Sequence, residues 1–168
     1  LGYYSRARNL LKAARQVVAE HGGQFPQTAA ALRKLPGVGP YTAAAIASIC
    51  FDEPVAAVDG NVIRVVSRLF DIDLPMDSPA GKRAIEAAAA ELVSGHRPGD
   101  HNQGMMEIGA LICKPKNPVC DACPVRLHCA SRAAGTAEAR PVKQGKLKVK
   151  EVEMPFVVLT DGERVAMV

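Results

Sequence analysis

Aromatic side chains are scarce in this sequence of 168 residues: tryptophan is absent, and four phenylalanines and three tyrosines make up 4% of the chain. The core therefore has to be built mainly from Ala, Val, Ile and Leu, whose small side chains favour close packing of helices. A composition of 48% hydrophobic and 23% charged residues excludes long disorder and a collagen-like repeat. We expect a mainly α-helical globular protein.

Long hydrophobic runs, an initiating methionine and a signal-peptide pattern are also missing. The sequence contains no run of about eighteen apolar residues, the length that a membrane span needs, and it starts directly at Leu1-Gly2-Tyr3-Tyr4. We expect a chain that begins inside a domain and does not enter a membrane.

Acidic residues are rare in one segment only. Residues 1–112 carry eleven basic and eleven acidic side chains, whereas residues 113–150 carry nine basic and two acidic ones, a local charge of +7. Residues 151–168 carry a net charge of −3, so the net charge of the whole chain is +4. A basic segment beside closely spaced cysteines indicates an anionic partner such as a nucleic acid, although a solvated linker would have the same composition.

Hydrophobic periodicity, with Gly and Pro as stops, predicts six helices. They cover residues 5–21, 28–35, 40–51, 61–70, 79–94 and 101–112. The second and third helices meet at the hairpin Leu35-Pro36-Gly37-Val38-Gly39.

The chain changes character beyond residue 112. Residues 113–130 are loop-like, and residues 131–152 are polar and basic, as an interdomain linker would be. Residues 153–168 predict two strands around the turn at Asp161-Gly162, and two strands cannot form a stable domain alone. We expect a helical domain over 1–112, a cysteine loop over 113–130, a linker over 131–152, and a second, β-containing domain that starts at 153 and is cut at the C-terminus.

Four of the five cysteines lie within seventeen residues, with the spacing C-x6-C-x2-C-x5-C: Cys113, Cys120, Cys123 and Cys129. Two disulfides, a structural zinc site and an iron–sulfur cluster all use such a set. Disulfides are disfavoured because they need an oxidising compartment. Zinc sites usually pair two short C-x2-4-C knuckles, and only one is present here, which favours iron–sulfur. The fifth cysteine, Cys50, is expected to be a small buried hydrophobe.

Two short segments are candidates for chemistry. The glycines of the hairpin over residues 35–39 leave backbone amides at the start of the next helix, where they can hold a phosphate; a turn without a ligand is the alternative. Twenty residues further on, Asp59 precedes the predicted helix 61–70 in Val58-Asp59-Gly60-Asn61-Val62. Asp59 is either a simple N-cap or a catalytic carboxylate that faces the same strand of DNA as the hairpin.

The hairpin, the segment around Asp59 and the four-cysteine set together closely resemble the helix-hairpin-helix DNA glycosylases of the endonuclease III superfamily, and within it the MutY-type adenine DNA glycosylases. The resemblance covers residues 1–135, with the helix-hairpin-helix at 28–51. It implies a two-lobed helical fold with double-stranded DNA across the cleft, a 4Fe-4S cluster on the four cysteines, and a tail that enters a Nudix-like domain.

The resemblance also implies roles for single residues. Endonuclease III members carry a lysine nucleophile after the hairpin, whereas this sequence has Tyr41 there, so strand cleavage is not expected. Asp59 would stabilise positive charge on the sugar, with Tyr41 and Asn61 orienting it or the substrate. The implied DNA and base contacts are Leu35, Gly37, Val38 and Gly39 on the phosphates, Tyr3 as an aromatic wedge, and Gln103 and Met106 in the adenine pocket.

The implied function is hydrolysis of the N-glycosidic bond of adenine mispaired with 8-oxoguanine or guanine, by a monomer associated with DNA in a bacterial cytoplasm. The family's glutamate that protonates the leaving adenine has no match here, so we expect these 168 residues to be inactive alone unless another acid, such as Glu107, replaces it. Two alternatives stay open at this point: an endonuclease III-type glycosylase-lyase, and a non-catalytic DNA-binding module that contains zinc.

Overall fold

The computed structural model describes residues 4–145 and 162–163. Helices are the only regular elements among these residues, and none of them is long and apolar enough to cross a bilayer. In chain order they are α1 Tyr4–His21, α2 Ala29–Leu32, α3 Pro40–Phe51, α4 Gly60–Leu69, α5 Pro79–Leu92, α6 Pro98–Glu107, η1 Ile108–Ile112, η2 Cys120–Ala122, η3 Arg126–His128, α7 Ala130–Ala134 and η4 Ala137–Ala139.

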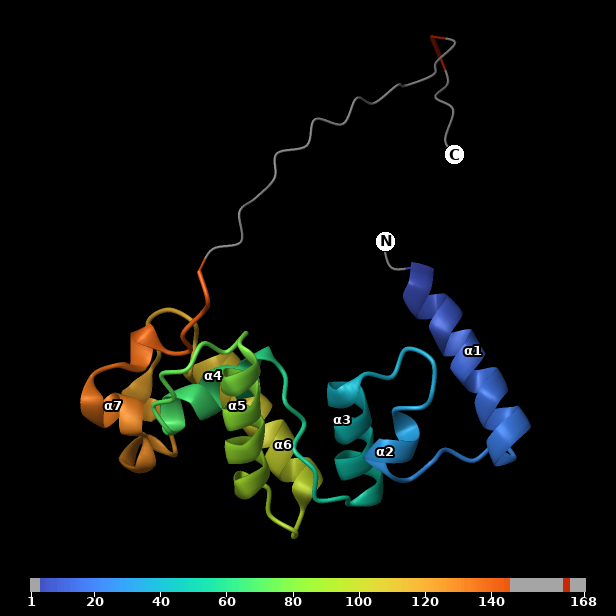
Figure 1. Cartoon of the computed structure of the whole chain (residues 1–168), viewed down its shortest axis with the longest axis horizontal. Coiled ribbons are helices and arrows are strands. Elements are labelled where there is room, and N and C mark those ends of the chain that lie inside the picture. The colour runs from blue at the N-terminus through green and yellow to red at the C-terminus, as the bar shows by residue number, and fades with distance from the viewer. Residues whose placement is uncertain (1–3, 146–161, 164–168) are drawn as a thin grey trace.

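The helices form two groups that meet where α3 packs against α6 (Figure 1). Helices α1, α2 and α3 lie at one end of the molecule, and α4 to α7 lie at the other. A connecting segment without helix or strand, residues 52–59, crosses from the end of α3 to the start of α4. The expected two-part helical architecture is therefore present in the described residues.

Each group has its own small core. The first core is buried between α1, α2 and α3 and consists of Ala13, Val17, Leu32, Leu35, Ala43 and Ala47. The second lies between α4, α5 and α6 and consists of Val62, Val65, Val66, Ile85, Ala89 and Met105. No aromatic residue belongs to either set, as the composition predicts, and the alanines on α3 allow its neighbours to approach closely.

Helix α1 leaves much of its apolar surface uncovered in this chain. Ala13 and Val17 are buried, but Leu10, Leu11 and Val18 are 73%, 54% and 69% exposed. The periodicity correctly predicts the helix, but only Ala13 and Val17 of its apolar residues are buried in the first core.

Three expectations about the helices need correction. The predicted helix over 28–35 covers only Ala29–Leu32, because the chain turns from Arg33 onward. The predicted helix over 101–112 starts earlier, at Pro98, and its last five residues form the π-helical turn η1. Cys50 is exposed instead of buried. The buried face of α3 passes through Ala43, Ala47 and Ser48, and Cys50 lies in the last turn at the edge of that face.

The first half of the expected linker is folded onto α4. Residues 130–139 form α7 and η4, and the backbone of Val142 accepts a hydrogen bond from Met76 N at 2.8 Å. The composition looks like a linker because this segment is held by polar contacts rather than by apolar burial. The remainder of the expected linker, and the predicted strands apart from Gly162 and Glu163, lie outside the described residues.

Asp71 is the centre of these polar contacts. Its Oδ1 accepts hydrogen bonds from Thr136 Oγ1 at 2.6 Å and Ser131 Oγ at 2.9 Å, and it forms an ion pair with Arg140 Nε at 3.0 Å. The bond from Thr136 is the main reason why the pKa of Asp71 lies below its ordinary value of 3.8; Ser131 and Arg140 lower it further, and burial opposes them. Asp71 therefore holds residues 131–140 to the end of α4 as a carboxylate.

Asp71→Asn should lower the melting temperature at neutral pH, because the amide loses the ion pair with Arg140 and its neutral oxygen is a weaker acceptor for Thr136 and Ser131. Since the pKa is lowered in the folded state, this stabilisation is present above the ordinary value of 3.8 and is lost as the pH falls through the folded value. Melting curves of both proteins from about pH 7 to about pH 3 should therefore converge on acidification. The exposed Asp73→Asn serves as the control, and a gap that stays constant with pH would contradict the assignment.

Candidate active site and cysteine centre

The hairpin is built by a tight turn between α2 and α3. Thr28 caps α2 through its Oγ1, which accepts from Ala31 N, and Leu35 is buried beneath the turn. Gly37 has φ +80°, and a Cβ there would lie 2.8 Å from Asn9 Cβ, so the turn needs a glycine at this position. Pro40 then opens α3 at its first position.

Gly39 differs from Gly37 because nothing within the described chain requires a glycine there. Its backbone is extended, with φ −82° and ψ 176°, and a Cβ would meet no atom within 4 Å. As the N-cap of α3 it stands beside the first backbone amides of the helix, which have no acceptor inside an α-helix. This end of α3 is thus open to a ligand that approaches the main chain closely.

Asp59 caps α4 and is half-buried. Its Oδ1 accepts from Val62 N at 2.8 Å, and its Oδ2 accepts from Asn61 Nδ2 at 3.1 Å. The N-cap interpretation is therefore correct in geometry, and it also fixes the carboxylate in a single orientation. A cap and a reactive carboxylate are compatible because each oxygen keeps a free acceptor direction.

Arg64 extends this hydrogen-bonded chain, and the sequence reasoning missed it. Its Nη2 donates to Asn61 Oδ1 at 2.9 Å and to Gly109 O at 2.8 Å, and its Nε donates to Cys113 O at 2.7 Å. Spacing along α4 could have paired Arg64 with Asn61, but the contacts to Gly109 and Cys113 join residues more than forty positions apart.

The π-turn η1 positions Gly109 and Cys113, whose carbonyl groups accept hydrogen bonds from Arg64. A Cβ on Gly109 would lie 2.6 Å from Asn61 Cβ, so the backbone of η1 packs directly on the start of α4. Single π-turns are uncommon and occur often at functional sites. Here the wider turn presents the carbonyl of Gly109 to Arg64 and leads straight into Cys113.

Tyr41 and Met106 are brought together across the contact of α3 with α6. Tyr41 Oη lies 3.4 Å from Met106 Sδ, and the tyrosine is 40% exposed. Gln103 is exposed, and its amide donates to Gly99 O of its own helix. Tyr3 lies outside the described residues.

A large hollow opens beside Tyr41. It has a volume of about 740 Å³ and is lined by segments from α2 to α5 that include Tyr41 and Val58, the residue before Asp59. Of the implied catalytic residues, Tyr41 belongs to this lining, whereas Asp59 and Asn61 do not, and neither do Gln103 and Met106.

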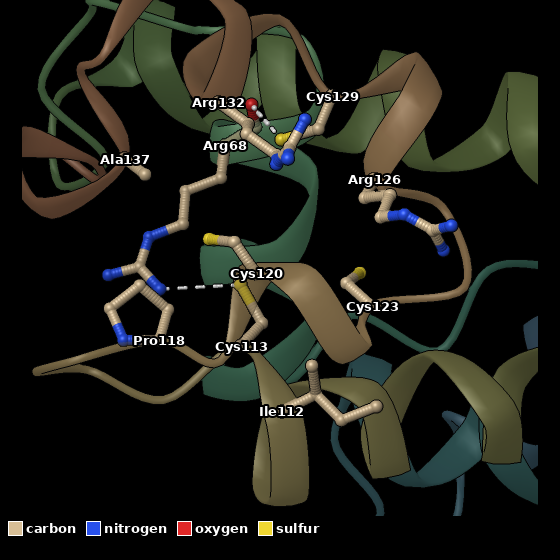
Figure 2. Close-up of a pocket in the computed structure, with 10 residues that line it drawn as sticks. All are labelled: Arg68, Ile112, Cys113, Pro118, Cys120, Cys123, Arg126, Cys129, Arg132 and Ala137. Carbon is tan, nitrogen blue, oxygen red and sulfur yellow. Dashed lines mark hydrogen bonds between the residues drawn. The ribbon is translucent and has the colours of Figure 1, made fainter.

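The four clustered cysteines surround one small cavity of about 30 Å³ (Figure 2). All are free thiols, so the disulfide alternative is wrong for this structure. Burial raises the pKa of the Cys120 thiol, and the nearby Cys113, Cys129 and Cys123 raise it further, while Arg68 lowers it. All four thiols line this one cavity. Among the described residues, no group of at least three His, Cys, Asp or Glu side chains has the arrangement to hold a metal ion.

Arg68 closes one side of the cysteine cavity. It is 2% exposed, and its guanidinium donates to Lys114 O at 2.7 Å, Pro115 O at 3.1 Å and Arg140 O at 3.1 Å, and approaches Cys113 Sγ at 3.3 Å. A buried cation held by hydrogen bonds of this kind offsets negative charge on thiolates. Arg126 and Arg132 line the same cavity.

Comparison with known proteins agrees with this geometry. The family model for the helix-hairpin-helix motif matches residues 20–49. Adenine DNA glycosylases from Rattus norvegicus and Homo sapiens are 51% and 49% identical to the chain over 77% and 79% of its length. That of Buchnera aphidicola subsp. Schizaphis graminum is 35% identical over 95% of it. The chain spans about a quarter of the rat and human proteins, 25% and 24%, and 46% of the Buchnera protein.

Solved structures show the same fold. A thermostable thymine-DNA glycosylase is 35% identical with a TM-score of 0.68, over 77% of this chain and 59% of that one. A non-covalent endonuclease III–DNA complex is 28% identical with a TM-score of 0.64, over 80% of this chain and 61% of that one. The chain belongs to the helix-hairpin-helix DNA glycosylases, and its sequence relatives lie in the MutY-type adenine branch.

Arg64→Met should destabilise the protein by about 1–3 kcal/mol, because carbonyl groups that accept from the guanidinium lose their donor. Arg64→Lys should rescue it only in part, since one ammonium cannot reproduce the planar fork. Urea unfolding of both variants tests this, with Arg83→Met on the exposed side of α5 as control. If Arg64→Met and the control had the same free energy of unfolding, the hydrogen bonds of the guanidinium would not contribute to stability.

Proposed function

We propose that the protein is a monofunctional adenine DNA glycosylase that hydrolyses the N-glycosidic bond of adenine paired with 8-oxoguanine or guanine. The observation that carries the proposal is Asp59, a half-buried carboxylate held by Val62 N and Asn61 at the start of α4, one residue after Val58, which lines the hollow together with Tyr41. The names of the sequence relatives support the choice of adenine.

Asp59 would act on the sugar. Breaking the glycosidic bond develops positive charge on the ring, and a carboxylate in a fixed orientation stabilises that charge without reorganising. Asn61 holds Oδ2, and Arg64 in turn holds Asn61, so the carboxylate is oriented before substrate arrives.

Tyr41 separates this proposal from the glycosylase-lyase alternative. A lyase of the endonuclease III type needs an amine to form a Schiff base with the sugar. The phenol of Tyr41 cannot do so. Tyr41 lines the hollow, and its Oη lies 3.4 Å from Met106 Sδ. We infer that the base is flipped into the hollow, and that the mispaired state lowers the cost of flipping.

We further infer that the cysteine centre holds a 4Fe-4S cluster. The donor set fits, because four free thiols surround one cavity beside the buried cation of Arg68, and thiolates are the ligands of such clusters. Cys113, Cys120, Cys123 and Cys129 would be its ligands, and the cluster would fix the loop over residues 113–129. The cluster supplies a rigid, redox-capable centre when bound.

The hairpin and the basic segment would bind double-stranded DNA. The open amides beside Gly39 suit a phosphate, and residues 113–150 supply the local charge of +7 from nine basic and two acidic side chains. Leu35 and Val38 shape the turn that presents these amides, and Tyr3 is proposed as the wedge into the duplex. A monomer in the bacterial cytoplasm stays a prediction.

Asp59→Asn should reduce adenine release from A·8-oxoguanine duplexes by at least about a hundredfold, because it removes charge at the developing cation but hardly changes shape. The assay uses single turnover, with a form of the protein that spans the length of its relatives. Duplex affinity should stay within about twofold. Asp73→Asn is the exposed control, and a variant of Asp59 that keeps the parent rate would refute the assignment.

Gly39→Val should weaken duplex affinity by about tenfold, because the side chain blocks the approach of a phosphate to the amides of α3. Its melting temperature should hardly change, since a Cβ there meets open space. Gly37→Ala should instead destabilise the fold, and Gly95→Val, also in open space, is the binding control. Affinity measured over a salt series should fall steeply for the parent. Parent-like binding by Gly39→Val would exclude a phosphate site at the hairpin.

Protein purified without oxygen should contain four irons per chain and absorb visible light. Cys120→Ser should lower the iron content, whereas Cys50→Ser, which changes an exposed cysteine on α3, should leave it unchanged. One equivalent of zinc without iron would favour the zinc-module alternative instead.

A further inference from the structure

Asn102 is the most completely bonded polar side chain between the two helix groups. It lies on α6, is 3% exposed, and uses both ends of its carboxamide. Its Oδ1 accepts from Ala57 N at 3.0 Å, and its Nδ2 donates to Val55 O at 2.9 Å and to Ser48 Oγ at 2.8 Å. A buried amide with every partner in place is a strong structural restraint.

The contacts to Val55 and Ala57 follow the pattern of a parallel β-pair. In a parallel ladder, one residue accepts from the N–H of residue i+2 and donates to the carbonyl of residue i on its neighbour. The side chain of Asn102 does both to residues 55–57 of the connecting segment, in a part of the chain where the described residues form no strand. It therefore takes the place of a neighbouring strand for residues 55–57 and restrains their backbone.

The same side chain ties together the three segments that carry the proposed reaction site. Ala57 lies two residues before Asp59, Ser48 lies on the helix that carries Tyr41, and Met106 lies one turn further along α6 from Asn102. The contact has little freedom, because a Cβ on Gly99 would lie 2.9 Å from Ser48 O and Ile49 Cα. A shift of Asn102 would thus move Asp59 relative to Tyr41 and Met106.

We propose that Asn102 is a positioning residue for Asp59: by bonding Val55 O, Ala57 N and Ser48 Oγ, it sets where the carboxylate stands relative to the base site. The catalytic part of this inference rests on the proposed function, but the positioning itself does not. Only a carboxamide suits the role, because Val55 O requires a donor and Ala57 N requires an acceptor. Aspartate, of nearly the same shape, satisfies only the second.

The test compares Asn102→Asp and Asn102→Ser with Ser67→Ala. Serine is too short to reach Val55 O and Ala57 N, so Asn102→Ser removes both hydrogen bonds without adding a charge. Ser67 is 1% exposed on α4, and its hydroxyl has no hydrogen-bond partner among the described residues, so Ser67→Ala is a matched buried change that breaks no bond. Amide hydrogen exchange is read at Ala57, which Asn102 binds, and at Val62, whose amide is bound by the Asp59 carboxylate.

Both Asn102 variants should speed exchange at Ala57 and at Val62 by about tenfold relative to amides in the middle of α5, whereas Ser67→Ala should speed neither. The adenine-release rate in single turnover should fall by about tenfold, with duplex affinity within about twofold of the parent. If one variant does not fold, the other gives the result.

Faster exchange at Ala57 with parent-like exchange at Val62 would overturn the inference, since the segment would then be loosened without moving the Asp59 cap. A parent protein that releases no adenine would instead refute the proposed function, and the exchange at Val62 would still decide whether Asn102 positions Asp59.

Discussion

The structure depends on the close approach of one backbone, that of α6 and η1, to two others. At Gly99 this backbone touches α3, and at Gly109 it touches the first turn of α4; a Cβ at these positions would come within 2.9 Å and 2.6 Å of the neighbouring atoms. Close contact excludes water, so the buried polar groups at the junction need hydrogen-bond partners inside the protein. Asn102, Asn61 and Arg64 are the side chains that satisfy them.

This constraint explains how a chain with few aromatic residues can hold a precise site. Its two cores are small, and the two helix groups meet where α3 packs against α6. Hydrogen bonds between side chain and backbone add a directional restraint at this contact, because they favour a narrow range of distances and angles. The carboxylate of Asp59 is thus placed by amide and guanidinium groups, on a framework of closely packed alanines and glycines.

The cysteine centre and the candidate active site share the same support. Arg64 reaches from Asn61 to the carbonyl of Cys113, and Arg68, one turn further along α4, approaches the sulfur of that cysteine. Helix α4 therefore presents Asp59 at its first turn and two buried or half-buried cations towards the cysteine loop. Asp71, just beyond its end, holds residues 131–140 over the same helix.

Local chemistry in the sequence determined the helices, the hairpin and the set of four cysteines. Periodicity predicts α1, α3 and α4 almost to the residue, because their apolar positions, Pro40 in the first turn of α3 and Asp59 at the N-cap of α4 act within a few neighbours. Tertiary structure alone decided what Arg64, Asn102 and Asp71 do, since each binds groups about 45 to 65 positions away. It also exposed Cys50 and folded the basic segment after Cys129 onto α4, because polar contacts between distant residues leave no periodic signal in composition.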